Sequence, residues 1–455
     1  MLGSLLCYHY CVYAYDIMVL TMPIYRRILK FSTLVTFCLT LALILTACSI
    51  LPGQKKEAGV TLEYWDLWAT QTAVDTVIND YKKIKPNVNI AYKKRTPQQY
   101  RETLENQIKT GKGPDIFTFH NTWTLMLKEE LDPVPSDVVS QSEFKNNFYP
   151  VVFSDLRVNN KFVGIPLEFD GLALFYNEDI FKAGGITKPP SSWTEFAQTA
   201  AKLTVKDSAG NIRTAGAALG TASNIDHFSD ILGMMILQNG GDPKSPTDKQ
   251  SADALEYFAN FAKGENKVWD EIMPRSSTAF VGNNLAMYFG PSWRAAEFRN
   301  GNPLLKFKVA PVPQLEGNKV AWATYWAEGV STASTHKKEA WEFLKYLQSD
   351  EVLIKLYNES AKSPGRLFGE PYPKISLATK LASDPIVGAY ISQAPYARSF
   401  PMASRTYDNG INDQIIKAYE DAVNDVAEGD QASEALETTA KNVTQILARY
   451  SSSSQ

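Results

Sequence analysis

Aromatic and hydrogen-bonding side chains gather in four short stretches of the sequence, each beside glycine, proline, amide or charged residues. These stretches contain Trp65, Asp66 and Trp68; His120, Asn121 and Trp123; Ser292, Trp293 and Arg294; and Trp322, Tyr325, Trp326 and Glu328. An aromatic ring can cover the C–H face of a pyranose, while carboxylates, amides and guanidinium groups bind its hydroxyls in fixed directions. The combination favours a binding site for a carbohydrate.

Ten side chains are the candidates for contact with such a ligand. They are Trp65, Trp68, His120, Asn121, Asp170, Trp293, Arg294, Tyr325, Trp326 and Glu328. For any single tryptophan the alternative is burial in the core, where most large aromatic residues lie. Asp170 lies between two apolar segments, and a buried carboxylate there would be stabilised by hydroxyl donors at ~1.5–3 kcal/mol for each charge-assisted bond.

The first part of the chain has the pattern of a parallel α/β sheet. Residues 60–65 and 88–92 alternate as strands, and residues 115–119 are apolar enough for a strand that is buried on both faces. Helical spacing of apolar residues marks residues 74–81 and 100–108 between these strands. Because ligands bind at the carboxyl ends of strands in such sheets, the residues after the first and third strands should line one cleft.

A second α/β block follows, and the last third of the chain is strongly helical. Residues 161–166 and 172–177 are predicted strands, and Ser192 with Glu195 forms a capping box at the start of a helix. Residues 206–211 have the composition of a hairpin turn. Further strands are predicted at 285–289 and 307–312, and further helices at 230–239, 340–347, 352–357, 415–426 and 432–450.

The N-terminal region has the layout of a bacterial secretory signal that ends in a lipid-attachment cysteine. Arg26, Arg27 and Lys30 precede a short apolar stretch that closes with Leu45-Thr-Ala-Cys48. The stretch is short and rich in threonine for a membrane span, which needs ~20 apolar residues. We therefore expect residues 1–47 to be a signal peptide, Cys48 to be lipidated, and residues 48–59 to form a polar tether.

Cleavage before Cys48 changes what the composition means. Cys7, Cys11 and Cys38 are removed, so Cys48 is the only cysteine left and the exported domain has no disulfides. The loss of three basic residues and Asp16 changes the formal charge from −3 to −5, which argues against nucleic acid as a partner. Met18 and Met22 precede the basic cluster, so residues 1–21 are expected to precede the true translation start.

Several classes of chemistry lack their sequence signatures. The chain has no Walker-type nucleotide loop and no Gly-x-Ser-x-Gly elbow, and no two of its mature histidines have metal-ligand spacing. The glycines at Gly111-Lys-Gly-Pro-Asp115 read as a turn before a buried strand. We therefore expect no cofactor, no metal and no catalytic residues.

At this point the ordered motifs resemble the extracellular solute-binding proteins of family 1, the group of bacterial sugar-binding proteins that includes maltose-binding protein. The matching blocks are Pro114-Asp-Ile-Phe117, Gly164-Ile-Pro-Leu-Glu-Phe-Asp-Gly-Leu-Ala-Leu-Phe-Tyr-Asn177, Ser192-Trp-Thr-Glu-Phe196, Ala279-Phe-Val-Gly282, Ala286-Met287, Gly290-Pro-Ser-Trp293, Val309-Ala-Pro-Val-Pro313 and Ala340-Trp-Glu-Phe-Leu344. Each block is weak alone, but together they span about residues 60–450 in the family's order.

The resemblance implies a two-lobed α/β fold of the periplasmic-binding type, with parallel-rich sheets, lobes that are discontinuous in sequence, and ligand held between lobes that close by a hinge. The implied lobes are residues 60–168 with 327–365 and residues 169–326 with 366–450, followed by a disordered tail at 451–455. Connecting segments are expected near 168–170, near 322–326 and shortly after Pro364. Asp170 and Trp293 fall where the family places an acid near the sugar and a stacking tryptophan.

The same resemblance implies a lipid-anchored, monomeric subunit of an ABC importer, outside the cytoplasmic membrane, that delivers a mono- or oligosaccharide to permease subunits. The segments 65–68, 119–123 and 224–227 do not copy the maltose protein, so the particular sugar is not implied. Two alternatives remain open. One is a surface glycosidase with Asp170 and Glu328 as its acid pair, and the other is a ligand-presenting subunit of a sensor kinase or chemoreceptor.

Overall fold

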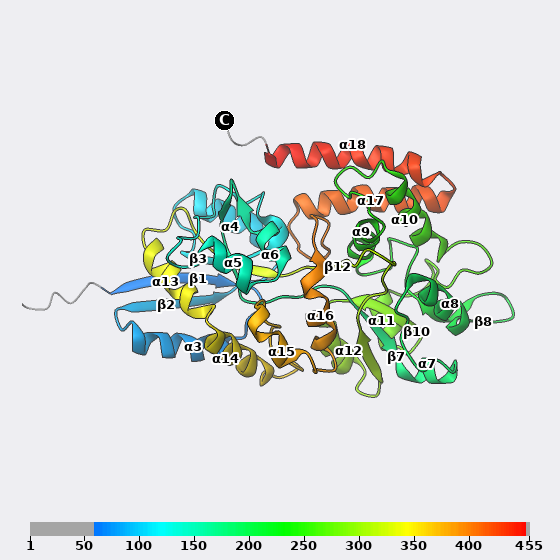
Figure 1. The fold of residues 1–455 in the computed structure, drawn as a ribbon, viewed down its shortest axis with the longest axis horizontal. Helices are drawn as coiled ribbons and strands as arrows, with labels where there is room; N and C mark the ends of the chain where they lie inside the picture. Colours follow the sequence, from blue (N-terminus) through cyan, green and yellow to red (C-terminus); the bar gives the residue numbers. More distant parts are fainter. Residues whose placement is uncertain (1–58, 452–455) are drawn as a thin grey trace, which may run out of the picture. The chain divides into compact units, whose positions relative to one another are not determined.

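The structure, a computed structural model, describes residues 59–451, and all of these from Val60 onward belong to the second of two compact units, Val60–Gln455. The predicted signal peptide, Cys48, most of the tether, and residues 452–455 of the tail lie outside the described residues. Within residues 59–451, none of the helices is long and apolar enough to cross a membrane. Two separate five-stranded sheets, each with its own helices, form two lobes (Figure 1).

The first lobe is built on a sheet with the strand order β2-β1-β3-β13-β6. Its strands are β1 (Val60–Asp66), β2 (Val88–Lys94), β3 (Ile116–His120), β6 (Ile165–Pro166) and β13 (Trp326–Val330). The first three strands are parallel, as predicted, whereas β13 runs antiparallel to both β3 and β6. Its helices are α3 (Gln71–Ile84), α4 (Tyr100–Lys109), η1 (Asn121–Trp123), α5 (Gln141–Asn147), α6 (Pro150–Asp155), α13 (Lys337–Leu347) and α14 (Asp350–Ala361).

Local sequence signals explain these elements. The Thr70 side chain caps α3 by accepting a hydrogen bond from the Ala73 amide, and the buried face of the helix repeats at Val74, Val77 and Tyr81. All five residues of β3 are buried, as its apolar sequence predicts for a strand between two layers. Because β3 is fixed on both faces, the residues that follow His120 have a defined position.

The second lobe has a mixed sheet with the strand order β11-β7-β10-β9-β8. Its strands are β7 (Ala173–Asn177), β8 (Val205–Lys206), β9 (Ile212–Ala217), β10 (Leu285–Gly290) and β11 (Phe307–Ala310). Only β9 and β10 pair in parallel within this sheet, so the parallel character expected of each lobe is confined here to one pair. Its helices are α7 (Glu178–Ala183), α8 (Trp193–Leu203), α9 (Phe228–Gln238), α10 (Lys249–Asn260), α11 (Ser276–Val281), α12 (Arg294–Gly301), α17 (Ile411–Glu428) and α18 (Ala432–Ser451).

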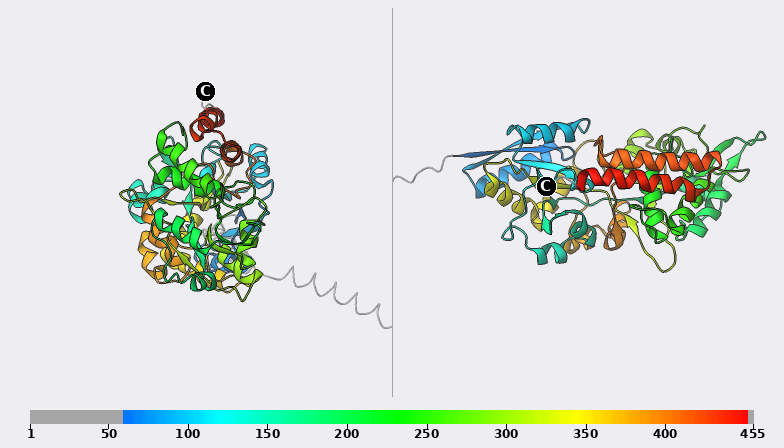
Figure 2. Two further views of the ribbon diagram at one scale, coloured as in Figure 1. Left: turned by 90° about the vertical axis from the view of Figure 1, so that its right-hand side faces the viewer. Right: turned by 90° about the horizontal axis from the view of Figure 1, so that it is seen from above.

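Two predicted local motifs are confirmed in this lobe. Ser192 and Glu195 form the reciprocal capping box at the start of α8. The β8–β9 hairpin closes where the Asp207 amide donates to the Asn211 carbonyl oxygen at 2.9 Å. At the end of the chain, α17 and α18 pack side by side, as Figure 2 shows.

Each lobe contains segments that are far apart in the sequence. In Figure 1, α13 and α14 lie with the N-terminal strands, although the whole second sheet separates them in the chain. A stretch near the junction contacts both lobes. On the side of the first lobe, η2 (Ile375–Leu377) contacts α5 and η3 (Ala394–Tyr396) contacts α6. On the side of the second lobe, Tyr390 of α16 (Val387–Gln393) donates a hydrogen bond to the carbonyl oxygen of Gly290 in β10. The remaining elements are α15 (Ala378–Leu381) and the small pairs β4–β5 (Arg157–Val158, Lys161–Phe162) and β12–β14 (Ala321–Trp322, Ala397–Arg398).

The segments that connect the lobes are hydrogen-bonded to one another. The Thr324 amide donates to the Asp170 carbonyl oxygen, and the Ala323 amide donates to that of Arg398. The Phe169 amide donates to the carbonyl oxygen of Pro371. These bonds join the segments near residues 170, 323 and 371, and β14 adds a contact that the sequence patterns did not indicate.

Gly171 lies at a close approach of two of these segments. It forms a β-bridge with Ala323, and a Cβ atom at position 171 would lie 2.0 Å from the carbonyl oxygen of Trp322. That oxygen is a backbone atom and cannot move aside without shifting the segment. Glycine is therefore required for the pairing.

We predict that Gly171→Ala lowers the free energy of unfolding by about 1–3 kcal/mol, because the new methyl group forces the connecting segments apart. Urea unfolding measures the change. Gly301→Ala is the matched control, since its Cβ would meet only the two methyl groups of Val281, at 3.2 and 3.6 Å. Equal stability of the two variants would contradict the account of this contact.

Candidate functional site

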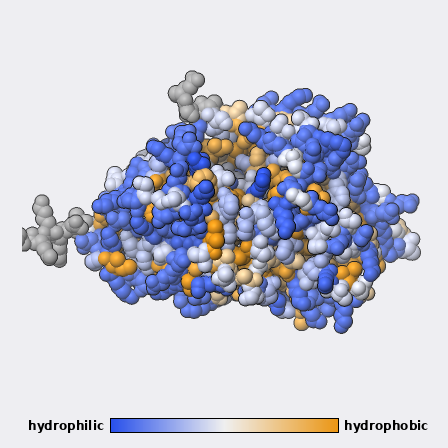
Figure 3. Space-filling view, in the orientation of Figure 1, coloured by the Kyte–Doolittle hydropathy of each residue, from blue (hydrophilic) through white to orange (hydrophobic). Residues whose placement is uncertain are grey.

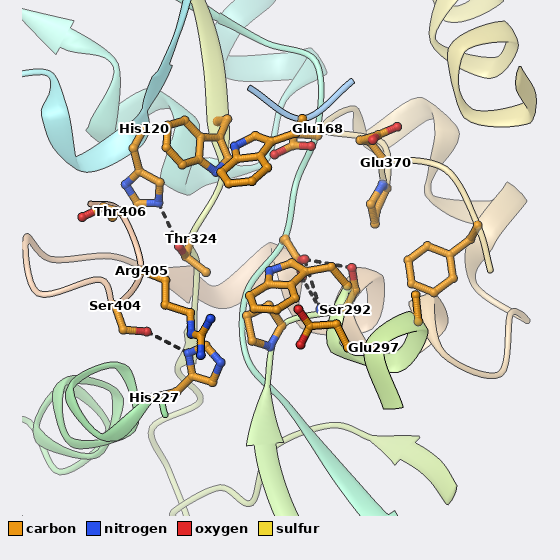
Figure 4. Close-up of a pocket in the computed structure, with 18 of the residues that line it drawn as sticks. His120, Glu168, His227, Ser292, Glu297, Thr324, Glu370, Ser404, Arg405 and Thr406 are labelled. Carbon is orange, nitrogen blue, oxygen red and sulfur yellow. Dashed lines mark hydrogen bonds between the residues drawn. The ribbon is translucent and has the colours of Figure 1, made fainter. Parts of the chain in front are cut away.

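A cavity of about 360 Å³ lies between the two lobes and is lined by both of them and by the connecting segments. Figure 4 shows His120 and Glu168 on one side of the cavity and His227, Ser404 and Glu297 on the opposite side. In Figure 3 the face shown is mostly hydrophilic, with apolar residues gathered toward its middle. The lining residues are Trp68, His120, Glu168, Asp170, His227, Asp230, Pro291, Ser292, Trp293, Ala296, Glu297, Thr324, Trp326, Arg366–Pro371 and Ser404–Tyr407.

Trp326 is the centre of an aromatic wall formed by the first lobe. Its ring makes edge-to-face contacts with Trp68, His120 and Trp123, with ring centroids 5.0–5.5 Å apart. Such contacts fix the orientation of the indole ring. β13 begins at Trp326 and pairs with β3 so that Trp326 lies opposite His120. Strand register therefore places the two rings together at the cavity.

Trp293 provides a second aromatic surface from the other lobe. It precedes α12 and retains 38% of its surface exposed, which is unusual for so large an apolar side chain. The Arg294 guanidinium lies 4.5 Å from the ring centroid and that of Arg405 lies 5.9 Å away. These cations hold the indole in place, and its exposed area lines the cavity.

Asp170 is a buried carboxylate held by backbone and side-chain donors. Its oxygens accept hydrogen bonds from the amides of Gly171 and Ser292 at 2.7 and 3.1 Å, and from the Ser292 hydroxyl at 2.8 Å. Burial raises the pKa of Asp170 to about 7, although these donors oppose the rise. The carboxyl group lines the cavity and can accept from hydroxyl groups of a ligand.

Glu168 lies two residues away and faces the cavity without a fixed partner. Within the described residues its carboxyl group has neither a hydrogen bond nor an ion pair. Burial, together with the nearby charges of Glu370, Asp170 and Asp66, raises its pKa well above the usual range. Glu370, by contrast, forms an ion pair with Arg366. The cavity therefore offers more carboxyl groups than cations.

A smaller cavity of about 50 Å³ shares walls with the main one and contains Asp66 and Glu328. Glu328 is 5% exposed and accepts hydrogen bonds from the Thr118 hydroxyl at 2.8 and 2.9 Å. Burial, then the charge of Asp66, raises the pKa of Glu328 well above its usual range. Glu328 thus faces this side cavity and does not line the main cavity with Asp170.

Half of the ten residues singled out in the sequence line the main cavity. These are Trp68, His120, Asp170, Trp293 and Trp326. Arg294 is 2% exposed and does not line the cavity itself, but it contacts the lining residues Trp293, His227 and Glu297. Trp65 lies elsewhere, because side chains alternate along β1 and its ring faces Tyr100 of α4, with Arg95 stacked on it at 4.2 Å.

Asn121 and Tyr325 are buried together at a polar cluster outside the lining of the main cavity. The Asn121 side-chain amide and the Tyr325 hydroxyl donate to the Asp155 carboxylate at 2.8 and 3.1 Å, and the Ser399 hydroxyl donates to it at 2.7 Å. Burial raises the pKa of Asp155 to about 6. These side chains join three parts of the lobe junction and are placed to hold it together.

Several lining residues did not stand out in the sequence. His227 and Asp230 lie at the start of α9, and Glu168 was noted only as part of a connecting segment. The stretches 366–371 and 404–407 line the cavity with irregular backbone and show no periodic pattern. A weak signal was the non-apolar composition of residues 224–227, next to an otherwise apolar helix.

This arrangement of two lobes around a lined cavity agrees with comparisons to known proteins. The model of the family described as bacterial extracellular solute-binding protein matches residues 67–353. The chain belongs to this family. In this solute-binding protein, the matched region includes both aromatic walls and Asp170 but ends before residues 366–371 and 404–407.

Curated relatives match this solute-binding protein only in part. A binding protein of Brucella abortus (strain 2308) is 23% identical over 54% of the chain, which spans 61% of that relative. A probable amino-acid ABC transporter periplasmic-binding protein of Sinorhizobium fredii is 22% identical over 59% of the chain and 63% of its own length. The multiple sugar-binding protein of Streptococcus mutans is 21% identical over 70% of the chain and 78% of its own length.

Solved structures share the fold of this solute-binding protein over most of its length. An ABC transporter solute-binding protein from Thermotoga lettingae, bound to α-D-tagatose, has a TM-score of 0.64 and 22% identity, and it covers 86% of this chain and 100% of its own. A cyclo/maltodextrin-binding protein complexed with maltotetraose has a TM-score of 0.68 and 16% identity, and the match covers 88% of this chain and 100% of the maltodextrin-binding chain. At these identities the likeness shows the two-lobed fold alone.

Asp170 should make stability depend on pH. With its pKa near 7 in the folded protein and 3.8 as the reference, the folded state keeps a proton that the unfolded chain releases between about pH 4 and pH 7. The free energy of unfolding therefore falls as pH rises through this window. We predict that the fall in the free energy of unfolding between pH 4.5 and pH 7.5 is about 2–4 kcal/mol smaller in Asp170→Asn than in the wild type, as measured by urea unfolding at the two pH values.

Asp248→Asn is the control, because hydrogen bonds at the start of α10 lower the pKa of Asp248 and it does not titrate in this window. Its effect on stability should be the same at both pH values. Parallel pH profiles for wild type and Asp170→Asn would contradict the assignment of the buried proton to Asp170.

Proposed function

We propose that this solute-binding protein captures a carbohydrate in the cavity between its lobes. The observation that carries the proposal is the pairing of two fixed indole surfaces, Trp326 and Trp293, with carboxyl groups that have acceptor capacity, Asp170 and Glu168. Aromatic faces suit the C–H faces of sugar rings, and carboxylates suit their hydroxyls. The cavity volume of about 360 Å³ lies within the usual range of small-molecule sites, about 300–1,000 Å³.

The two lobes would bind the ligand from opposite sides. Trp326 and Trp68 come from the first lobe, Trp293 comes from the second, and Asp170 and Thr324 come from the connecting segments between them. A sugar that contacts both lobes favours the arrangement in which they lie close together. Hinge motion would be absorbed by the connecting segments, whose backbone contacts are few compared with those of a sheet.

The exported location and the partners belong to the same proposal. Cleavage before Cys48 and lipidation of its thiol would anchor the chain to the outer face of the cytoplasmic membrane, with residues 48–59 as a tether. There a closed, sugar-bound monomer would deliver its ligand to the permease subunits of an ABC importer. Presentation to a sensor kinase or chemoreceptor would use the same binding site, and only the partner proteins differ.

The glycosidase alternative requires two carboxyl groups on either side of one glycosidic bond. Asp170 lines the main cavity, whereas Glu328 faces the smaller side cavity and is engaged by Thr118. No observation favours this pair as an acid and nucleophile. The binding role is therefore the function that the cavity supports best.

A thermal-shift panel tests the proposed function directly. We predict that one or more of α-D-tagatose, mannobiose, mannotriose, maltotetraose and cycloalternan raises the Tm, because a ligand that binds only the folded state stabilises it by mass action. Amino acids are included as the competing solute class. Stabilisation by an amino acid, with no response to any sugar, would contradict the carbohydrate assignment.

The aromatic walls should carry much of the affinity. We predict that Trp293→Ala and Trp326→Ala each weaken binding of the stabilising sugar by more than about 1 kcal/mol in calorimetric titration, with cooperative unfolding retained. Trp341→Ala is the control, because Trp341 is 1% exposed in the first lobe, donates a hydrogen bond to Asp132 and does not line the cavity. That variant should lose stability and keep its affinity. Unchanged affinity in Trp293→Ala would contradict a contact between the Trp293 indole and the bound sugar.

The excess of carboxyl groups should select against anionic sugars. We predict that glucose 6-phosphate and glucuronate bind at least tenfold more weakly than glucose when the three are compared at pH 8.5 by calorimetric titration or by competition against the stabilising sugar, because Asp170, with a pKa of about 7, is then charged and repels a negative ligand. Asp170→Asn should narrow this gap, because it removes that charge. Glu420→Gln on the surface of α17 is the control and should leave it unchanged. Tighter binding of the phosphate would contradict this electrostatic account.

A further inference from the structure

Two hydroxyl groups, those of Thr324 and Ser404, line the cavity, and each is bonded to a histidine ring. His120 Nε2 lies 2.9 Å from Thr324 Oγ1, and His227 Nδ1 lies 2.7 Å from Ser404 Oγ (Figure 4). A hydroxyl can donate or accept, and a neutral imidazole carries its proton on either nitrogen. What these hydroxyls offer a ligand therefore depends on which nitrogen of each ring is protonated.

The first chain of hydrogen bonds starts at Asn412, which is fully buried near the start of α17 and does not line the cavity. Its Oδ1 accepts from the Ala403 amide at 3.0 Å, and a backbone N–H can only donate. Its Nδ2 must then donate, both to the Asp408 carboxylate and to Thr122 Oγ1, each at 2.7 Å. The network thus fixes the orientation of this side-chain amide.

The donor and acceptor roles in the next hydrogen bonds, from Thr122 to the cavity, follow from this orientation. Because Thr122 Oγ1 accepts from Asn412, its own proton is free to be donated to His120 Nδ1, 2.7 Å away. The backbone amide of Thr122 also points at this nitrogen, at 3.3 Å. His120 Nδ1 is therefore an acceptor, and the ring carries its proton on Nε2 and donates it to Thr324 Oγ1.

The second chain reaches Ser404 from Arg294. The Nε–H of Arg294 can only donate, and it lies 3.2 Å from His227 Nε2. His227 therefore carries its proton on Nδ1 and donates it to Ser404 Oγ. Burial lowers the pKa of both histidines, that of His120 to about 3, so both rings are neutral near pH 7.

We propose that Thr324 and Ser404 act as paired hydroxyl donors toward acceptor oxygens of the bound carbohydrate, with Asn412 and Arg294 as positioning residues that act through His120 and His227. Each hydroxyl oxygen already accepts a hydrogen bond from a histidine N–H, so its own O–H is left to donate to the ligand. This inference rests on the proposed function for the nature of the ligand. The histidine tautomers that it requires are a property of the protein alone.

The proposal gives the cavity two chemically distinct sides. Asp170 and Glu168 accept hydrogen bonds from ligand hydroxyls, whereas Thr324 and Ser404 donate to ring or glycosidic oxygens and hydroxyl lone pairs. Ser404 is held in place by strained backbone, since the non-glycine residues Arg405 and Tyr407 that follow it have φ values of 61° and 55°. Arg405 is tied to Asp226 at 2.9 Å, which fixes this conformation.

Nitrogen-15 NMR of the full chain with labelled histidines tests the inference without a ligand. The chain has four imidazoles, His9, His120, His227 and His336, which single His→Gln variants assign. Couplings to the ring C–H protons show which nitrogen carries the proton. We expect opposite tautomers at pH 7, Nε2–H for His120 and Nδ1–H for His227. Observation of Nδ1–H at His120, Nε2–H at His227, or a charged ring at either position would overturn the proposal.

Substitutions separate positioning from general stability. Thr122→Val keeps the shape of the side chain and removes the donor to His120, so the second tautomer of His120 should become populated while His227 is unchanged. Asn412→Ala should act on His120 in the same way. Thr204→Val is the control, because the Thr204 hydroxyl donates to the Ala200 carbonyl oxygen in α8. This variant should leave the tautomer of every histidine unchanged. No response of His120 to either relay variant would overturn the role of Asn412.

The donor role is measured with the sugar that gives the largest thermal shift in the panel. Thr324→Val should weaken its binding about tenfold, and Thr324→Ser should restore it because the hydroxyl returns. Equal affinity of Thr324→Val and wild type would overturn the donor role. Failure of every sugar would instead contradict the proposed function, whereas the tautomer result would stand by itself.

Discussion

The close approach of the connecting segments at Gly171 is the contact on which the geometry of the cavity depends. Here a glycine allows the backbone of one connection to lie against the Trp322 carbonyl of another, and the Thr324 amide bonds the Asp170 carbonyl oxygen. The side chains of Asp170 and Thr324 enter the cavity from these two strands of backbone. Their separation is thus set by main-chain hydrogen bonds, which are shorter and stiffer than side-chain packing.

The cavity concentrates groups whose burial is costly. Asp170 and His120 are both held away from water, and burial shifts the pKa of each in the direction that favours its neutral form. The protein offsets this cost with directed donors, such as the Ser292 amide and hydroxyl on Asp170. A polar ligand that completes these hydrogen bonds would offset it further, so the same groups that weaken the fold are suited to bind a solute.

Much of the fold could be predicted from the sequence because its local signals are strong. The apolar run of β3, the Ser192–Glu195 capping box and the β8–β9 turn all formed where the pattern placed them. Strand pairing was harder to predict from the sequence, because β13 joins the first sheet only after the chain has formed the strands of the second. The antiparallel pairs of the second sheet depend on such long-range contacts and leave little trace in short windows.

Ring-bearing residues next to a strand end, as at His120, Trp293 and Trp326, line the cavity, and their contact with a ligand stays a prediction. Trp65 was predicted to lie in the cleft, although strand alternation turns its ring toward α4. Asn121 follows His120 directly, yet the turn into η1 directs it to Asp155. Residues 404–407 could not be predicted, because irregular backbone has no period and its position is set by contacts with Asp226 and Asp230.

The most direct test of the central claim is a crystal structure of the protein grown with the panel sugar that stabilises it most. The account predicts a sugar between the lobes with a ring against Trp293 or Trp326, its hydroxyls on Asp170 or Glu168, and an acceptor oxygen within hydrogen-bond distance of Thr324 or Ser404. A sugar bound outside this cavity, or in it without contact to either indole, would contradict the account.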